Sequence, residues 1–214
     1  MVGRVGDPFG PLGTGQTPLD PDESDGLLPS WVRTREDLNL AESDNIVAAR
    51  TRVRARSTDD VLDDSWLRRL HRAMFGDVWR WAGTYRTTER NIGIDPVQIA
   101  VAVRDLVADA RAWIAHDGVG NLDQPLEDRR LAALTIAARF HHRLVAIHPF
   151  PNGNGRHARF ATDLLVEAMG LGIELSWGAG LGDPPTARRR YLDALRAADR
   201  DRDDLAPLVD LMCS

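Results

Sequence analysis

The stretch from residue 126 to residue 147 is apolar on much of the circumference that a helix would give it. A helix with so wide an apolar surface is covered on most sides by other elements. We therefore expect a central, buried helix here. The apolar side chains are Leu131, Leu134, Ala137, Ala138, Phe140, Leu144, Val145 and Ile147.

Other segments repeat apolar residues at intervals of three and four, the spacing of one helix face. No internal repeat is evident, so each segment is an independent element of a bundle. The segments predict helices over residues 30–56, 57–75, 96–113, 156–169 and 186–200.

The stretch from Tyr85 to Asp95 interrupts this helical pattern. Its two threonines, Asn91 and Gly93 favour a strand or a turn. The sequence therefore predicts a mostly α fold, a helical bundle around a central helix–loop–helix, with one short β-hairpin.

Composition divides the chain into three parts. Residues 1–29 are rich in Gly, Pro and Asp, which predicts a flexible N-terminal arm. Residues 30–57 predict an accessory helical segment, for which a regulatory role is a hypothesis. Residues 58–214 contain the main domain.

The charged residues exclude several classes of function. All 27 basic residues are Arg, so the chain lacks both the phosphate-binding Lys of a Walker motif and a Lys for a Schiff base. A net charge of −5 argues against a nucleic-acid-binding protein.

Hydropathy and cysteine content limit the cellular locations and the kinds of site that the chain can have. No apolar run reaches the roughly 18 to 20 residues of a membrane span, so no membrane contact is expected. The N-terminus lacks the apolar core of a secretory signal, which predicts a cytoplasmic protein. Cys213, the single cysteine, can form neither an internal disulfide nor a cysteine-based metal site.

Residues 148–159, with the sequence HPFPNGNGRHAR, carry the candidate site. A proline disfavours helical geometry in the residue before it, so the central helix should end at or just before His148. This position places an imidazole at the mouth of the core, where a general base could act.

The second half of the same segment predicts an anion site. Gly153 and Gly155 flank Asn154 and permit backbone angles that point successive N–H groups into one concavity. The positive N-terminal end of the next helix and the guanidinium groups of Arg156 and Arg159 reinforce it. These features predict a polyphosphate cradle; a plain helix–loop–helix turn with incidental arginines is the alternative.

Residues 148–159 resemble the Fic motif, HPFx[D/E]GNGRxxR, at every fixed position but one. Upstream, Trp81-Ala82-Gly83 with Arg86 is similar to the WAGxxR element before the Fic flap, and residues 140–144 are similar to the helix that leads into the motif. The resemblance covers about residues 60–170 and implies the Fic fold.

Residues 70–95 are similar, more narrowly, to the Fic subgroup called mobile mystery protein B. The family resemblance implies a protein adenylyltransferase, in which His148 deprotonates a Ser, Thr or Tyr hydroxyl of a target protein. The hydroxyl then attacks the α-phosphate of ATP and expels pyrophosphate, while Phe150 anchors the loop in the core. The resemblance implies phosphate binding by Gly153, Asn154 and Gly155, by Arg156 on the α/β-phosphates and by Arg159 on the γ-phosphate.

Residues 86–95 would form the flap of the resembled family. An exposed hairpin edge can hold a target segment by strand addition without reading much of its sequence. The target could be a second molecule or the chain itself, and an antitoxin-like regulator is a further hypothesis from the resemblance. The candidate target-binding residues are Thr87, Thr88, Glu89, Arg90, Asn91 and Ile92.

Asn152 stands where the family usually has an Asp or Glu that binds Mg²⁺. An amide oxygen coordinates without charge, so we expect Asn152 to be a weak metal ligand and Mg²⁺ affinity to fall by about a factor of ten or more.

Many Fic proteins are inhibited by a helix bearing [S/T]xxxE[G/N], whose Glu pairs with the second motif Arg. Glu42 and Asp44 are the nearest inhibitory candidates here, and neither matches the pattern cleanly. An ordinary packing helix over residues 30–56 is the alternative.

Three other functions compete with AMP transfer. The first keeps the fold but transfers phosphate or phosphocholine, and the second is a non-catalytic nucleotide- or partner-binding module, which the departure at Asn152 favours. The third is a metal-dependent hydrolase, against which stands the angle of about 100° between adjacent histidines on a helix. Its ligands would be His141, His142, His148 and His157, of which the first two are otherwise packing residues and His157 solvent-facing.

Overall fold

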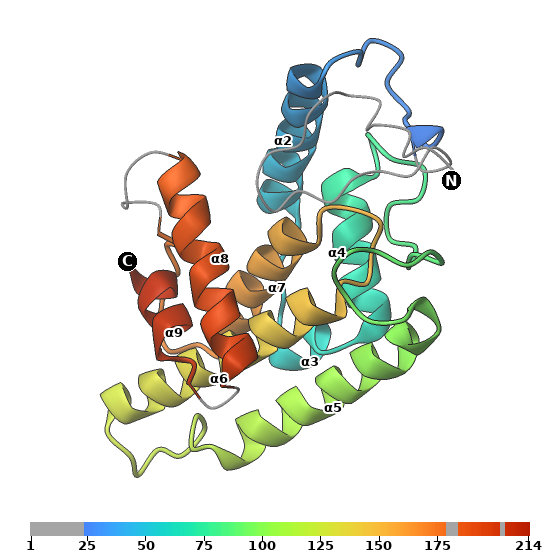
Figure 1. The fold of residues 1–214 in the computed structure, drawn as a ribbon. Helices are drawn as coiled ribbons and strands as arrows, with labels where there is room; N and C mark the ends of the chain where they lie inside the picture. The colour runs from blue at the N-terminus through green and yellow to red at the C-terminus, as the bar shows by residue number, and fades with distance from the viewer. Residues whose placement is uncertain (1–23, 179–183, 202–203) are drawn as a thin grey trace.

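The computed structural model describes residues 24–178, 184–201 and 204–214, and these are mostly helical (Figure 1). The predicted arm over residues 1–29 lies outside the described residues up to residue 23. The helices are α2 (Arg35–Arg52), α3 (Thr58–Val61), α4 (Asp64–Phe75), α5 (Ile99–His116), α6 (Leu126–Ile147), α7 (Asn154–Ala168), α8 (Pro184–Arg200) and α9 (Ala206–Cys213), with a short 3-10 turn at Pro96–Gln98.

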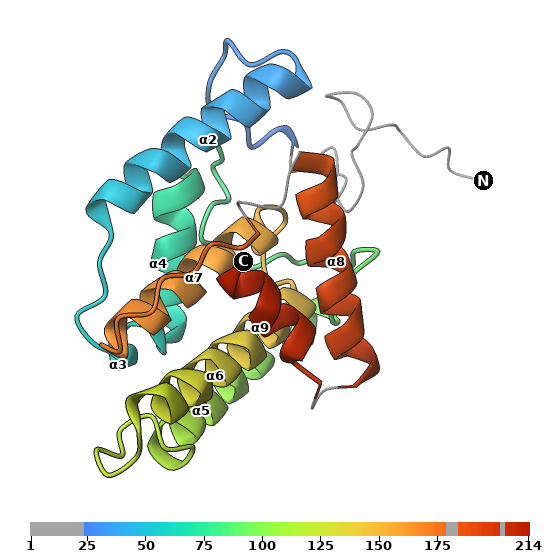
Figure 2. The ribbon, with the colours of Figure 1, turned by 90° about the vertical axis from the view of Figure 1, so that its left-hand side faces the viewer.

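Helix α6 is the central element, and its predicted bounds of 126 and 147 are confirmed. It packs against α7, α5 and α9, so three sides of the helix are covered (Figures 1 and 2). Ile136, Ala137, Ala138 and Phe140 have no exposed surface. Burial on several sides therefore explains most of the apolar circumference, although Leu131 is 60% exposed.

Two large apolar clusters meet at α6, beside a third, small one that contains Ala133 and Ile136. The larger one is built around α4, α5 and α7, and includes Leu70, Met74 and Leu106. The smaller one joins α6 to α8 and α9 through Ala137, Ala138 and Leu208. Helices α6 and α7 therefore form a common base, and α2 and α8 lie apart from each other on it (Figure 2).

Helix α2 begins with a capping box and lies along α4. The Thr34 hydroxyl accepts from the Asp37 N–H at 3.1 Å, and the Asp37 carboxylate accepts from the Thr34 N–H at 3.0 Å. Leu38 and Ala49 bury their side chains in the larger cluster. Each end of the buried face thus contributes to the core, and α2 is an integral part of the bundle.

The structure corrects the predicted β-hairpin. Residues 85–95 form an irregular loop, and in the described part of the chain the β-type pairing is an isolated bridge between Leu27 and Trp79. The Arg86 side chain donates hydrogen bonds to backbone carbonyls of this segment. These carbonyls therefore do not pair with a facing strand. Arg86 donates to the carbonyls of Thr88 and Ile94.

Two further differences concern helix boundaries. The segment predicted over 57–75 is two helices, because Asp63 caps a new helix by accepting from the Trp66 N–H at 2.7 Å. Helix α9 was not predicted, since its eight residues span little more than two helical turns, too few to show a clear periodicity. None of the helices in the described ranges is both long and apolar enough to cross a membrane.

Candidate functional site

The loop between α6 and α7 starts at His148, where α6 ends as the sequence predicts. His148 has φ 53° and ψ 60°, in the left-handed region, which turns the chain sharply away from the helix axis. Non-glycine residues adopt this conformation at a cost, and such residues are concentrated at functional sites. The turn sets the imidazole at the entrance to the core, with 6% of its surface exposed.

The loop is closed by its own side chains and backbone. The Asn154 amide accepts from the Phe150 N–H at 2.9 Å and donates to the Phe150 carbonyl at 2.7 Å. Phe150 is fully buried and its ring stacks on His71 at 3.8 Å, which agrees with its expected role as an anchor. The Asn154 side chain therefore holds the loop together.

Helix α4 packs against the loop between α6 and α7. The His71 ring bonds to the Asn152 carbonyl at 3.0 Å, and Gly153 has φ 78°. A Cβ at Gly153 would lie 2.5 Å from the Phe75 ring, closer than real contacts allow. Glycine at this position is thus required both by the backbone angle and by the neighbouring ring.

The N-terminal end of α7 offers backbone N–H groups to an anion. The first bond of the helix runs from the His157 N–H to the Gly153 carbonyl, so the preceding amides have no partner within the helix. A Cβ at Gly155 would meet only the Tyr191 hydroxyl at 3.6 Å, an ordinary contact. This part of the loop faces open space, as an anion site needs.

The two motif arginines have different surroundings. Arg156 forms an ion pair with Glu42 of α2 at 2.8 Å, and its guanidinium lies 5.0 Å from the centre of the Phe75 ring. Arg159 lies 5.1 Å above the Tyr191 ring of α8 and forms no ion pair with any residue that the structure describes. Burial lowers the pKa of Arg159, while Tyr191 acts in the opposite direction.

Glu42 is itself buried and held in place. Its second carboxylate oxygen accepts from the Trp79 ring N–H at 2.7 Å, and 4% of the residue is exposed. Asp44, the other inhibitory candidate, is exposed and lies outside the cavity lining. The structure therefore brings Glu42, and not Asp44, to the motif arginines.

Residues 86–95 pass directly over His148. Arg86 donates to the His148 carbonyl at 2.7 Å and its own N–H donates to the Pro149 carbonyl at 3.0 Å. A Cβ at Gly93 would lie 2.6 Å from the His148 Cβ. The loop thus covers the imidazole closely, and Ile92 is the one flap candidate among the described cavity residues.

The imidazole of His148 is kept neutral by its environment. Burial lowers the pKa of His148 to about 4, the charges of Arg86 and Arg90 add to this, and a hydrogen bond with the Val145 backbone opposes it. A neutral imidazole is the form that can accept a proton. At neutral pH the group is therefore ready to act as a base.

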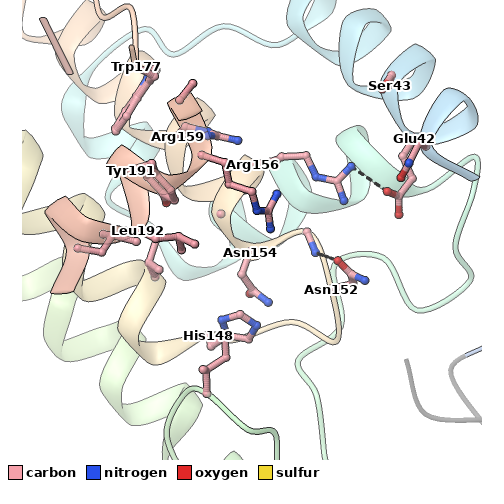
Figure 3. A pocket seen from close by; sticks show the side chains of 18 of the residues that line it. Glu42, Ser43, His148, Asn152, Asn154, Arg156, Arg159, Trp177, Tyr191 and Leu192 are labelled. Atoms are coloured by element: carbon pink, nitrogen blue, oxygen red, sulfur yellow. Dashed lines mark hydrogen bonds and ion pairs between the residues drawn. The ribbon is translucent and has the colours of Figure 1, made fainter. Parts of the chain in front are cut away.

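These residues line one cavity of about 510 Å³, a size in the usual range for small-molecule sites (Figure 3). Figure 3 shows Glu42 and Ser43 of α2 on one side, and Trp177, Tyr191 and Leu192 on the other. The predicted residues Asn152 to Arg156, Arg159 and His148 all belong to it. Trp177 and Tyr191 were not predicted as site residues, because they come from segments without a motif.

The donor atoms do not form the carboxylate site that Mg²⁺ prefers. The Asn152 side-chain oxygen accepts from the Gly153 N–H at 2.6 Å, and Glu42 is the one carboxylate among the described residues that line the cavity. Glu42 already pairs with Arg156 and Trp79. The residues present therefore do not fit a divalent cation held by the protein.

The remaining histidines serve packing. His141 bonds to the Tyr191 hydroxyl at 3.0 Å and His142 to Asp199 at 2.8 Å, as expected for packing residues. His157 is buried and bonds to the Leu67 carbonyl at 2.9 Å, so its predicted solvent-facing position is wrong. No group of three metal-ligating side chains occurs in the residues that the structure covers, which argues against the hydrolase.

Comparison with known proteins relates the chain to one family. The Fic/DOC family model matches residues 61–166. The chain is 28% identical over 158 residues to "Protein adenylyltransferase fic-1" of Caenorhabditis elegans, covering 72% of this chain and 26% of that protein, so it spans about a quarter of that relative. It is 29% identical over 163 residues to "Probable protein adenylyltransferase y4lH" of Sinorhizobium fredii, covering 74% and 76% of the two chains.

The fold also matches solved structures. The N-terminal Fic domain of a VirB-translocated Bep effector protein of Bartonella quintana, solved with bound ADP, superposes with a TM-score of 0.62. The two chains are 18% identical, and the superposition covers 86% of each. The predicted mostly α Fic fold is confirmed by this likeness.

Proposed function

Because residues 61–166 belong to the Fic/DOC family, we propose that this chain is a protein adenylyltransferase, which transfers AMP from ATP to a hydroxyl group of a protein. The names of the relatives support this reaction. The single observation that carries the proposal is that His148, the amides at the start of α7 and two arginines share one cavity.

In this proposal each group has a role. The triphosphate binds against the free amides at the start of α7, with Arg156 and Arg159 neutralising its charge. The target hydroxyl gives its proton to His148 as its oxygen bonds to the α-phosphorus. The bond from the α-phosphorus to the bridging oxygen breaks, and pyrophosphate leaves. The protein contributes position and charge, which is what phosphoryl-type transfer requires.

The loop at residues 86–95 is the proposed place of target binding. It lies over His148, and Thr87, Thr88, Glu89, Asn91 and Ile92 are exposed along it. An extended target segment could pair with this backbone beside the imidazole. Self-modification, an antitoxin-like partner and the subgroup remain predictions of the resemblance, and a cytoplasmic location remains a prediction from the N-terminal sequence.

Regulation by α2 is part of the proposal. Glu42 holds Arg156 at 2.8 Å from within the same chain, so the arginine must leave this carboxylate before it can bind phosphate. The resemblance implied a pair with the second motif arginine, and here Glu42 pairs with the first. We expect α2 to restrain the reaction through this one contact.

Labelled ATP distinguishes the proposed reaction from its rivals. Label on the α-phosphate should pass to protein and label on the γ-phosphate should not. Transfer of γ-label would indicate a kinase-like reaction instead. A second candidate is a nucleotide-binding module without transfer, which the folded-back Asn152 side chain favours; ATP binding with neither label transferred would support it.

A further inference from the structure

The cavity carries more positive charge than the motif supplies. Besides Arg156 and Arg159, its lining includes Arg35 of α2 and Arg188 of α8. Among the described residues that line the cavity, the one carboxylate is that of Glu42. Three helices thus direct arginines to one site, an arrangement that is suited to a polyanion.

Arg188 lies on the face of α8 that meets the motif. Tyr191, three residues further on, shares this face and carries the guanidinium of Arg159 on its ring. Burial lowers the pKa of Arg188, and the charges of Arg159 and Arg156 lower it further. The three cations are therefore close enough to repel one another, a cost that a bound polyphosphate would remove.

At position 152 the cavity has an amide, where a carboxylate would hold a divalent cation. The Asn152 amide oxygen is neutral and faces the Gly153 N–H at 2.6 Å. A carboxylate at this position would add a negative charge beside the phosphates and would need a metal ion to offset it. An amide adds none, so the charge of the triphosphate is left to the arginines.

We propose that Arg188, with Arg35, is a phosphate-binding residue of this chain, and that guanidinium groups neutralise the triphosphate in place of a divalent cation held by the protein. ATP then binds almost equally well with and without Mg²⁺. In the transfer step the same groups stabilise the departing pyrophosphate. The inference about the transfer step rests on the proposed function, whereas the inference about binding does not.

Calorimetric titration of ATP tests the binding claim without any turnover. Titrations in excess EDTA and in saturating Mg²⁺ should give dissociation constants within about threefold of each other. They should be repeated in Glu42→Gln, where Arg156 is released. Arg188→Gln should weaken binding about tenfold in EDTA, the size expected for one charge-assisted contact.

Arg189→Gln is the matched control, because Arg189 is exposed like its neighbour Arg188 but is not among the cavity residues. It should change the dissociation constant less than about twofold, since an exposed charge acts weakly at a distance. Asn152→Asp should weaken ATP binding in EDTA and restore much of it when Mg²⁺ is added. Thermal melting of each variant shows that the fold is kept.

Three results would overturn the proposal. The first is that ATP binds the native chain and Glu42→Gln at least tenfold more weakly in EDTA than in Mg²⁺. The second is that ATP binds to neither protein. The third is that Arg188→Gln and Arg189→Gln change the dissociation constant equally. Metal-independent ATP binding without AMP transfer would support the guanidinium site and contradict the proposed function, so the two failures can be told apart.

Discussion

Two loops meet at His148, and they are built in opposite ways. The loop over residues 148–153 buries Phe150 completely and is closed by the Asn154 amide. The loop over residues 86–95 is fixed mainly at its base by Arg86, and most of its side chains are exposed. The loop that carries the chemistry is thus fixed in advance, whereas the loop proposed to meet the target keeps an open surface.

Loss of the imidazole should have the largest effect. In His148→Ala the proposed base is gone, and the rate of AMP transfer should fall about 10²–10⁴-fold, the usual contribution of a general base. The rate is measured from α-labelled ATP. His116→Ala, which alters an exposed histidine at the end of α5, serves as the control and should keep the native rate.

Gly153→Ala should destabilise the loop over residues 148–153. The residue needs φ 78°, and its new Cβ would lie 2.5 Å from Phe75, so the fold should lose about 2 kcal/mol. This corresponds to a melting temperature roughly 4–8 °C lower for a chain of this size. Gly155→Ala is the control, because its Cβ meets an ordinary contact at 3.6 Å and should change melting little. Equal melting of both variants would contradict the account of this loop.

Glu42→Gln should raise the rate of AMP transfer by about tenfold. The glutamine keeps the volume and can still accept from Trp79, but it no longer holds Arg156 by charge. Asp44→Asn removes a charge from the exposed side of the same helix and should leave the rate unchanged. An unchanged rate in Glu42→Gln would mean that α2 is a packing helix only.

The pH dependence should reflect the buried imidazole. Because the pKa of His148 is lowered to about 4, kcat/KM should stay nearly constant from pH 7 down to about 5, where an ordinary histidine would lose most of its base form. An acidic limb near 6.5 in the free enzyme would contradict this.

Protein stability should fall as the pH is lowered, whereas a histidine in a salt bridge would make it rise. His148 and His157, each with a pKa lowered to about 4, bind protons less readily when folded than when unfolded. Their contribution is complete above about 6.5 and is lost as the pH falls towards 4. Denaturant titrations at pH 7.5 and 5 should therefore show a smaller free energy of unfolding at the lower pH.

The smallest effects should come from the side chains of the open loop. If a target binds by backbone pairing, Thr87→Ala should change self-modification less than about twofold, because it leaves the backbone intact. Thr87→Pro removes the N–H and should lower the rate about fivefold, the cost of one hydrogen bond. A larger effect of alanine than of proline would indicate recognition by the side chain.

The sequence predicted those parts of the site that depend on local chemistry. Pro149 indicated where α6 ends, and the glycines with Arg156 and Arg159 indicated the loop that lines the cavity. The irregular path of residues 86–95 was missed because threonines favour strands in general. Here the Arg86 side chain satisfies the carbonyls of Thr88 and Ile94, a contact that no periodicity reveals.

Contacts between distant segments were also beyond the sequence. Glu42 and Arg156 are brought together only because α2 lies along α4. Tyr191 reaches Arg159 from α8, and its hydroxyl is held by His141. Glu42 and Tyr191 lie in no clear motif, so their place in the cavity depends on how the helices pack.

Intact-mass analysis tests the central claim most directly. The native chain, Glu42→Gln and the double variant Glu42→Gln/His148→Ala are each incubated with ATP. We predict a gain of one or more adenylate units in the native chain, a larger modified fraction in Glu42→Gln, and no gain in the double variant. Equal modification with and without His148, or none in Glu42→Gln even with added protein substrates, would contradict transfer of AMP at this site.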